Sequence, residues 1–185
     1  MASEREPGRA PAKRRLFFAL WPDDALRSEI ARAVRPVLEG RRARAVRTAN
    51  LHITLAFLGA VAEERVNDAI EAGEQVRGEA FELAIDHVES WRAAHVACLT
   101  LAPVPPPLAA LVERLRFSLT ARNLEPDPKE FRAHVTVARE WRDQRLDARI
   151  GPFVWRVREF ALVESTPGRE GSEYRVLRSF PLREP

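Results

Sequence analysis

The sequence lacks the residue patterns on which several common kinds of protein chemistry depend. Its single cysteine, Cys98, excludes a disulfide framework and a cysteine-rich metal site. It has no H-E-x-x-H pair, no glycine-rich phosphate loop and no G-x-S-x-G stretch, which argues against zinc peptidases, nucleotide-binding loops and serine hydrolases. No apolar run approaches the roughly 20 residues of a membrane span, and "LFFALW" is too short for a signal peptide. We therefore expect a cytoplasmic protein with no membrane association, no metal and no other cofactor.

Basic charge is carried almost entirely by arginine. Lys13 and Lys129 are the only lysines among 30 basic residues, and the formal net charge is only +3. The planar guanidinium of arginine binds phosphate through two hydrogen bonds, which suits a phosphorylated ligand. Codon usage in a G+C-rich genome produces the same bias, so charge alone does not indicate a nucleic-acid partner.

Hydrophobic spacing predicts an α+β fold in one domain. Residues 1–14 are polar, charged and proline-containing, which predicts a disordered tail, and residues 15–182 form the expected domain. Helical spacing of apolar residues predicts helices over residues 22–40, 63–77 and 108–119. Other apolar runs predict strands over residues 15–20, 51–58, 81–88, 95–101, 134–138, 153–164 and 174–180. Near Arg158 the alternation changes phase, which we interpret as a β-bulge.

Two predicted strands contain the same H-x-T motif. The stretch "NLHITLAFLG" carries His52 and Thr54, and "RAHVTVARE" carries His134 and Thr136. Because side chains alternate along a strand, each histidine points to the same side as its threonine, while the residue between them faces the core. The other two histidines of the chain lack this spacing, and packing in predicted strands explains them. We therefore expect the motifs to form one site built from two halves, rather than the solvated faces of two unrelated strands.

Two imidazoles and two hydroxyls suit the cleavage of a phosphodiester. Imidazole titrates near neutral pH, so one ring can accept a proton from the attacking oxygen while the other protonates the leaving oxygen. Arg139 follows the second motif and is placed to hold the phosphate. The basic stretch "RRARAVR" (Arg41–Arg47) precedes the first motif, where it is either a contact to further phosphates or a solvated loop. Spacing alone does not distinguish the two histidines.

The ordered set of motifs resembles the 2H phosphoesterase superfamily. The matching stretches are "RLFFAL", "NLHITLAFLG", "HVTVAR" and "LVESTPGREGSEYRVLRSFPL", which together span Arg15 to Leu182. Within the superfamily the sequence is most similar to the RNA 2′,3′-cyclic phosphodiesterases, historically called 2′-5′ RNA ligases. It departs from them at Ala133, where proline is usual, and at Val137, where leucine is commoner.

The resemblance implies a bilobed α+β fold with two pseudo-symmetric lobes, each with an antiparallel sheet and helices, and an active-site cleft between them. It also implies metal-independent hydrolysis of a 2′,3′-cyclic phosphate at an RNA 3′ end to a 2′-phosphate. In this family's mechanism His134 would be the proton acceptor that activates water, and His52 the proton donor to the departing 3′ oxygen. The phosphate would be bound by Thr54, Thr136 and Arg139.

Several alternatives stay open at this stage. Phe17 and Tyr174 are candidates for stacking on a base at the cleft, and core packing is the competing interpretation, above all for Phe17. The substrate is an RNA 3′ end or a nucleotide cyclic phosphate, with ADP-ribose cyclic phosphate and 2′-5′ oligonucleotides as rivals. Attack by a 5′ hydroxyl in place of water would give 2′-5′ ligation. A non-catalytic RNA- or nucleotide-binding module is the remaining rival, and we expect a monomer.

Overall fold

The computed structural model describes residues 12–101, 103–169 and 171–184. Three helices are present in this part of the chain: α1 (Asp24–Leu38), α2 (Val66–Gln75) and α3 (Pro106–Thr120). The strands are β1 (Lys13–Leu20), β2 (Arg44–Ala45), β3 (Ile53–Ala62), β4 (Phe81–Trp91), β5 (Val96–Thr100), β6 (His134–Arg139), β7 (Asp147–Val157), β8 (Glu159–Gly168) and β9 (Gly171–Pro181). Short 3₁₀ helices occur at η1 (Thr48–Asn50), η2 (Glu63–Arg65) and η3 (Arg92–Ala94).

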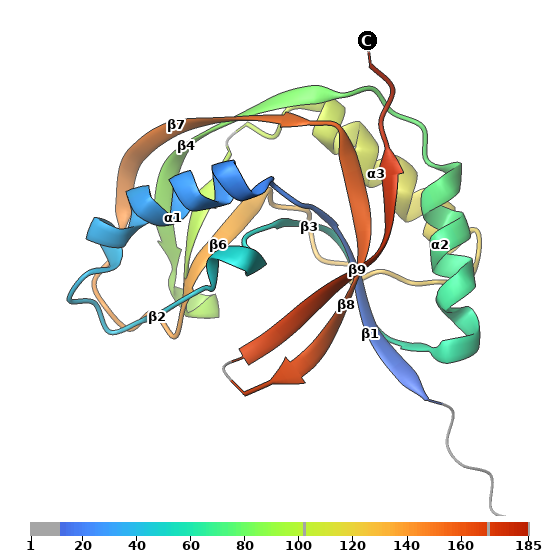
Figure 1. Cartoon of the computed structure of the whole chain (residues 1–185), viewed down its shortest axis with the longest axis horizontal. Helices are drawn as coiled ribbons and strands as arrows, with labels where there is room; N and C mark the ends of the chain where they lie inside the picture. The colour runs from blue at the N-terminus through green and yellow to red at the C-terminus, as the bar shows by residue number, and fades with distance from the viewer. Residues whose placement is uncertain (1–11, 102, 170, 185) are drawn as a thin grey trace, which may run out of the picture.

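The strands form one antiparallel sheet that divides into two lobes. The order is β7-β4-β5-β6-β3-β1-β8-β9, with β2 added at β6 (Figure 1). The two central strands, β3 and β6, share one register pair, Ile53 with Val135, whereas the strands within each half pair over longer stretches. The predicted α+β, bilobed architecture is therefore confirmed.

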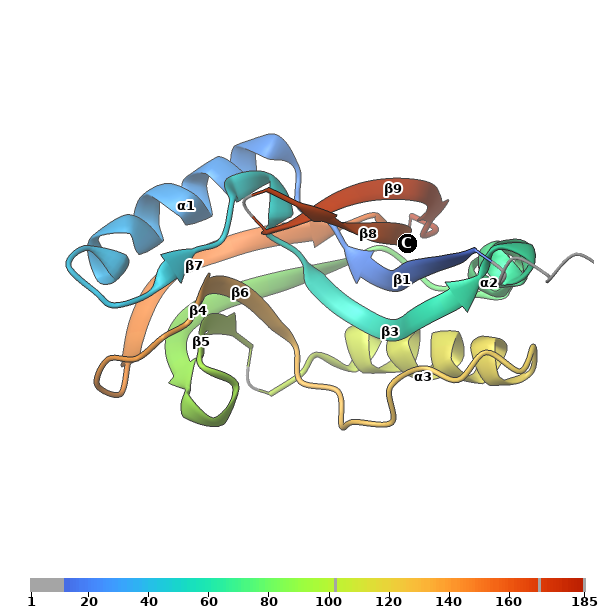
Figure 2. The ribbon, with the colours of Figure 1, turned by 90° about the horizontal axis from the view of Figure 1, so that it is seen from below.

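The helices cover the lobes in a crossed arrangement. Helix α1 follows β1 in the chain but packs on β6 and β7 of the other lobe, whereas α2 and α3 pack on each other and on β3, β8 and β9 (Figures 1 and 2). Asp23 caps α1 by accepting a hydrogen bond from the backbone of Leu26 at 2.8 Å, and the buried stripe continues through Ile30 and Val34. None of the helices in the described ranges is long and apolar enough to cross a membrane.

Alternation along β1 separates two apolar faces of the sheet. Leu16 and Phe18 are fully buried in the main core, which lies under the helices. The intervening residues point to the opposite face, where a smaller buried cluster contains Phe17, Ala19, Ala161 and Val163. Trp21 and Tyr174 pack against this second cluster, so it forms the apolar floor of the face that carries the H-x-T residues.

The structure corrects three expectations. The strand predicted over 153–164 is two strands, β7 and β8, separated by Arg158. Since β7 pairs with β4 and β8 with β1, the change of phase marks the passage from one lobe to the other, not a bulge. Strand β1 begins at Lys13, inside the segment predicted to be disordered, while residues 1–11 lie outside the described part of the chain. Strand β3 begins at Ile53, so His52 directly precedes it.

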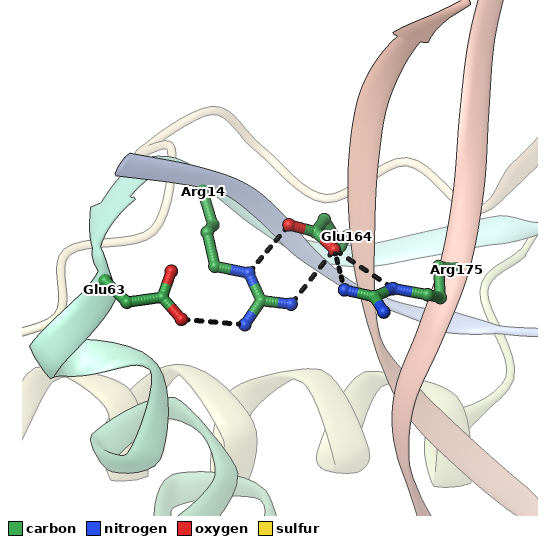
Figure 3. Close-up of polar contacts among 4 residues, drawn as sticks. All are labelled: Arg14, Glu63, Glu164 and Arg175. Atoms are coloured by element: carbon green, nitrogen blue, oxygen red, sulfur yellow. Dashed lines mark hydrogen bonds and ion pairs between the residues drawn. The ribbon is translucent and has the colours of Figure 1, made fainter. Parts of the chain in front are cut away.

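A buried carboxylate joins three neighbouring strands. Arg14 of β1 donates to Glu164 of β8 from Nε at 2.7 Å and from Nη2 at 3.0 Å, and Arg175 of β9 donates from Nη2 at 2.8 Å (Figure 3). Arg14 also donates to Glu63 at 3.3 Å. The hydrogen bonds from Arg14 and then Arg175 lower the pKa of Glu164 to about 2.

We expect Glu164→Gln to lower the free energy of unfolding by about 2 kcal/mol near neutral pH, because the amide loses charge-assisted hydrogen bonds from two guanidinium groups. The pKa of Glu164 is about 2 in the fold and ordinarily 4.5, so its contribution is complete above that ordinary value and is lost as the pH falls toward 2. Urea unfolding near neutral pH and near pH 2.5 checks both statements. A stability difference between the two proteins that is the same at both pH values would contradict them.

Candidate active site

The two H-x-T motifs meet where the lobes join. Ile53 of β3 pairs with Val135 of β6 in antiparallel register, and both side chains are fully buried. This register places each histidine opposite the threonine of the other motif, so that His52 faces Thr136 and Thr54 faces His134. Since side chains alternate along a strand, the two imidazoles and two hydroxyls lie on the face away from the main core. One pairing between two strands thus assembles all four groups.

This face borders a cleft of about 360 Å³. His52, Thr54 and Thr136 line it, and the described residues that line it include no aspartate or glutamate. Four arginines also line it, from β1, from β2 and the segment after it, and from β6: Arg15, Arg44, Arg47 and Arg139. Arg44 pairs with Glu140, which is not among the lining residues, at 3.0 Å. A cleft lined by four cationic side chains and no carboxylate among these residues attracts anions. A larger hollow of about 1080 Å³ between α2, α3 and the C-terminal segment contains none of the H-x-T residues.

The same backbone contact orients both imidazoles. Nδ1 of His52 lies 2.6 Å from the carbonyl oxygen of Asn50, and Nδ1 of His134 lies 2.6 Å from the carbonyl oxygen of Arg132. A carbonyl oxygen can only accept, so Nδ1 carries a hydrogen in each ring and donates it. Nε2 is therefore the nitrogen that gains or loses a proton. In His52 this atom lies 3.2 Å from the hydroxyl oxygen of Thr54.

Aromatic rings surround His52. The indole of Trp21 stacks on its imidazole with centroids 5.1 Å apart and an interplanar angle of 9°. Phe17 lies at 5.1 Å in a tilted arrangement, and Tyr174 approaches at 5.3 Å and 82°. Phe17 of β1, Trp21 directly after β1 and Tyr174 of β9 thus enclose the imidazole of His52, which directly precedes β3.

His134 has a different environment built around one ring. Trp91 lies 4.5 Å from its imidazole at an angle of 54°. The guanidinium of Arg132 lies 4.2 Å from the centre of the Trp91 ring, and the Trp91 indole donates to Glu89 at 2.7 Å. These contacts fix Trp91, and the backbone of Arg132 fixes the imidazole.

Burial determines the proton affinity of both histidines. It lowers the pKa of His52 from 6.5 to about 4, opposed by the hydrogen bond to Asn50 and assisted by the charges of His134 and Arg139. Burial also lowers the pKa of His134, again against a backbone hydrogen bond, with Arg132 and Arg139 contributing. At neutral pH in the unliganded protein both rings are therefore mainly uncharged, and each Nε2 carries a lone pair.

The structure brings the predicted residues to one place. His52, Thr54, Thr136 and Arg139 line the cleft. His134 is not among the lining residues, but the β3–β6 register sets it opposite Thr54, and its charge acts on His52. Tyr174 also lines the cleft and is half-buried. Phe17 is also among the residues that line the cleft, although only 3% of it is exposed and it packs on His52 and Tyr174. Its burial favours core packing, and its stacking on a base stays a prediction.

The sequence did not point to several residues that shape the site. Trp21, Trp91 and Asn50 contact the two histidines, and Arg15 lines the cleft from β1. The stacking tryptophans come from other segments of the chain, so no local spacing signals them. The basic stretch before the first motif was a partial signal, since two of its arginines reach the cleft: Arg44 and Arg47.

The two remaining histidines lie outside the site. His87 pairs with Asp147 at 2.9 Å, and His95 is an exposed residue in left-handed conformation at the end of η3. His95 was expected in a strand, but β5 begins one residue later because the chain turns at this position.

Comparison with known proteins places these features in a family. Residues 20–97 match the family model described as LigT like Phosphoesterase. The RNA 2′,3′-cyclic phosphodiesterase of Thermus thermophilus is 30% identical over 186 residues, which cover 91% of this chain and 90% of that protein. The enzyme of the same name from Escherichia coli is 29% identical over 172 residues, or 91% of this chain and 96% of that protein.

The fold agrees with the sequence relationship. The crystal structure of Escherichia coli LigT complexed with 3′-AMP superposes with a TM-score of 0.86 at 27% identity, over 92% of this chain and 99% of that one. A further crystal structure of a phosphoesterase gives a TM-score of 0.87 at 26% identity, over 93% and 99% of the two chains. The two H-x-T strands, their meeting at one cleft and these likenesses agree, and the chain belongs to the LigT-like phosphoesterase family of 2H phosphoesterases.

Proposed function

We propose that this protein hydrolyses the 2′,3′-cyclic phosphate at an RNA 3′ end to a 2′-phosphomonoester by two-histidine acid–base catalysis. The observation that carries the proposal is the β3–β6 register, which puts two imidazoles and two hydroxyls on one face beside an arginine-lined cleft. The names of the relatives from Thermus thermophilus and Escherichia coli support it, as does the 3′-AMP complex of LigT.

Proton transfer in this proposal takes place at the two Nε2 atoms. Nε2 of His134 accepts a proton from water as the water oxygen attacks phosphorus. The bond from phosphorus to the 3′ oxygen breaks, and Nε2–H of His52 gives its proton to that oxygen. The product carries its phosphate on the 2′ oxygen, and His52 has become neutral while His134 has become charged. The assignment of donor and acceptor follows the family resemblance, since both rings have the same Nδ1 contact.

Charge on the phosphate is balanced by donors that the cleft already presents. Thr54, Thr136 and Arg139 are the proposed phosphate ligands, and preorganised donors of this kind stabilise charge that develops on the equatorial oxygens. Arg15 and Arg47 also line the cleft, and their charge suits neighbouring phosphates of an RNA strand. Tyr174 is the proposed stacking partner for a base.

The proposed mechanism uses no metal ion. The two imidazoles supply proton transfer, and arginine and threonine supply the electrostatic stabilisation. Within the described ranges, no group of three or more histidine, cysteine, aspartate or glutamate side chains is arranged to hold a metal. The same geometry accepts a 5′ hydroxyl in the position of the attacking water, which would form a 2′-5′ linkage.

We expect His52→Ala and His134→Ala each to lower the turnover of a cyclic-phosphate-ended oligoribonucleotide by roughly 10²–10⁴-fold, because each removes one proton-transfer partner. His87→Ala is the matched control, since that histidine pairs with Asp147 outside the cleft, and its turnover should equal that of the unmodified protein. Circular dichroism confirms that the variants are folded. Full activity in either of the first two variants would exclude the two-histidine mechanism.

We expect kcat/KM to be highest on the acidic side of pH 6.5, because it reports the free protein, in which the pKa of both histidines is lowered. Activity needs one ring protonated and one neutral, so it falls at low pH when both are charged and at higher pH when both are neutral. Bound phosphate anion favours the charged rings, so the kcat profile should lie at higher pH than the kcat/KM profile. Steady-state rates across the pH range check this, and a kcat/KM maximum well above neutral pH would contradict it.

A further inference from the structure

Trp21 contacts His52 from outside the cleft. It follows the last residue of β1, is half-buried, and is absent from the residues that line the cleft. Its indole lies nearly parallel to the imidazole, at 9°, with centroids 5.1 Å apart. Tyr174 meets the same indole edge-on, at 6.0 Å and 90°. The tryptophan therefore contacts the site through His52 and Tyr174.

The contacts of His52 leave one edge of its ring for chemistry. Trp21 covers one face, Phe17 and Tyr174 pack around the rest, and the carbonyl of Asn50 holds Nδ1. Only Nε2, which lies next to Thr54, is directed at the residues of the cleft. The hydrogen bond at Nδ1 alone would let the imidazole rotate about that bond. A parallel ring stacked on one face restrains this tilting.

We propose that Trp21 is a positioning residue, whose indole holds the imidazole of His52 in the plane that points Nε2 at the reacting phosphate. The effect on turnover rests on the proposed function, whereas the restraint on the ring does not. His134 has its own ring, Trp91, at a tilt of 54°. The two histidines are thus held by different tryptophans from different lobes, which allows each to be tested separately.

Trp21 also affects how easily His52 is protonated. Burial, the largest effect, lowers the pKa of His52 from 6.5 to about 4, which is roughly a 300-fold loss of proton affinity. Attraction between an indole and an imidazolium opposes this effect, by roughly 30-fold for a desolvated pair. Because burial is the largest effect on His52, opening this face of the ring to water in Trp21→Leu should raise the pKa of His52. The other charged or titratable groups that act on this ring, His134 and Arg139 of β6 and Tyr174 of β9, stay in place.

The test compares Trp21→Leu with Trp21→Phe. Leucine removes the flat aromatic face, so we expect kcat to fall roughly 10- to 100-fold. KM should change little, because in this proposal Trp21 acts on turnover through the imidazole of His52. Phenylalanine keeps an aromatic face and should restore most of kcat. Should the leucine variant not fold, Trp21→Gln provides the same comparison.

Nuclear magnetic resonance of the histidine rings gives a readout that does not depend on turnover. The His52 signal, assigned by its loss in His52→Gln, should titrate at higher pH in Trp21→Leu, while the His134 signal keeps its titration. Trp91→Leu should move the His134 signal and leave that of His52. Phe117→Leu, a change at an aromatic residue that is 78% exposed, is the matched control and should alter neither signal nor the rate.

Two results would overturn the proposal. One is an unchanged His52 titration and unchanged kcat in Trp21→Leu. The other is an equal loss of kcat in the leucine and phenylalanine variants, which would show that side-chain size matters and the aromatic face does not. If the unmodified protein did not turn over any cyclic phosphate, the proposed function would fail, and the titration of His52 would still decide the role of Trp21.

Discussion

The site depends on one backbone pairing, between Ile53 of β3 and Val135 of β6. These two buried residues fix the register of the central strands, and the register places the histidine of each motif opposite the threonine of the other. A slip of one strand by one residue would turn its histidine and its threonine into the main core, while those of the other strand stayed on the cleft face. The pairing is short, yet it is supported on both sides by longer strand pairs within each lobe. Both lobes are therefore needed to define the site, because each contributes one histidine and one threonine.

Burial and positive charge act together in the cleft. Apolar and aromatic side chains remove water from the imidazoles and lower the pKa of both, whereas the arginine lining attracts an anion whose binding favours the charged rings. The unliganded site is then mainly neutral at its two proton-transfer atoms, and the phosphate itself promotes the protonation that its cleavage needs. This coupling is a physical reason why the described residues that line the cleft include histidine and arginine but no carboxylate.

The sequence predicted which residues meet at the cleft better than it predicted their surroundings. Period-two alternation in "LHITL" and "HVTV" was enough to place each histidine with its threonine and to bury Ile53 and Val135. It was not enough to show that β3 and β6 are neighbours, since strand order is a property of the whole chain. The stacking of Trp21 on His52 joins segments about 30 residues apart through side-chain orientation, which no local pattern encodes. The continuous strand predicted across Arg158 failed for a related reason, because adjacent strands of similar composition belong to different lobes.

The most direct measurement is the identification of the product formed from an oligoribonucleotide that ends in a 2′,3′-cyclic phosphate, incubated with the protein in excess EDTA. Mass spectrometry detects the addition of one water, and phosphorus nuclear magnetic resonance distinguishes a 2′- from a 3′-phosphate. We predict a 2′-phosphomonoester, formed at the same rate with and without the chelator. An unchanged substrate, or turnover that requires added metal, would contradict the two-histidine mechanism, and a 3′-phosphate would contradict the departure of the 3′ oxygen.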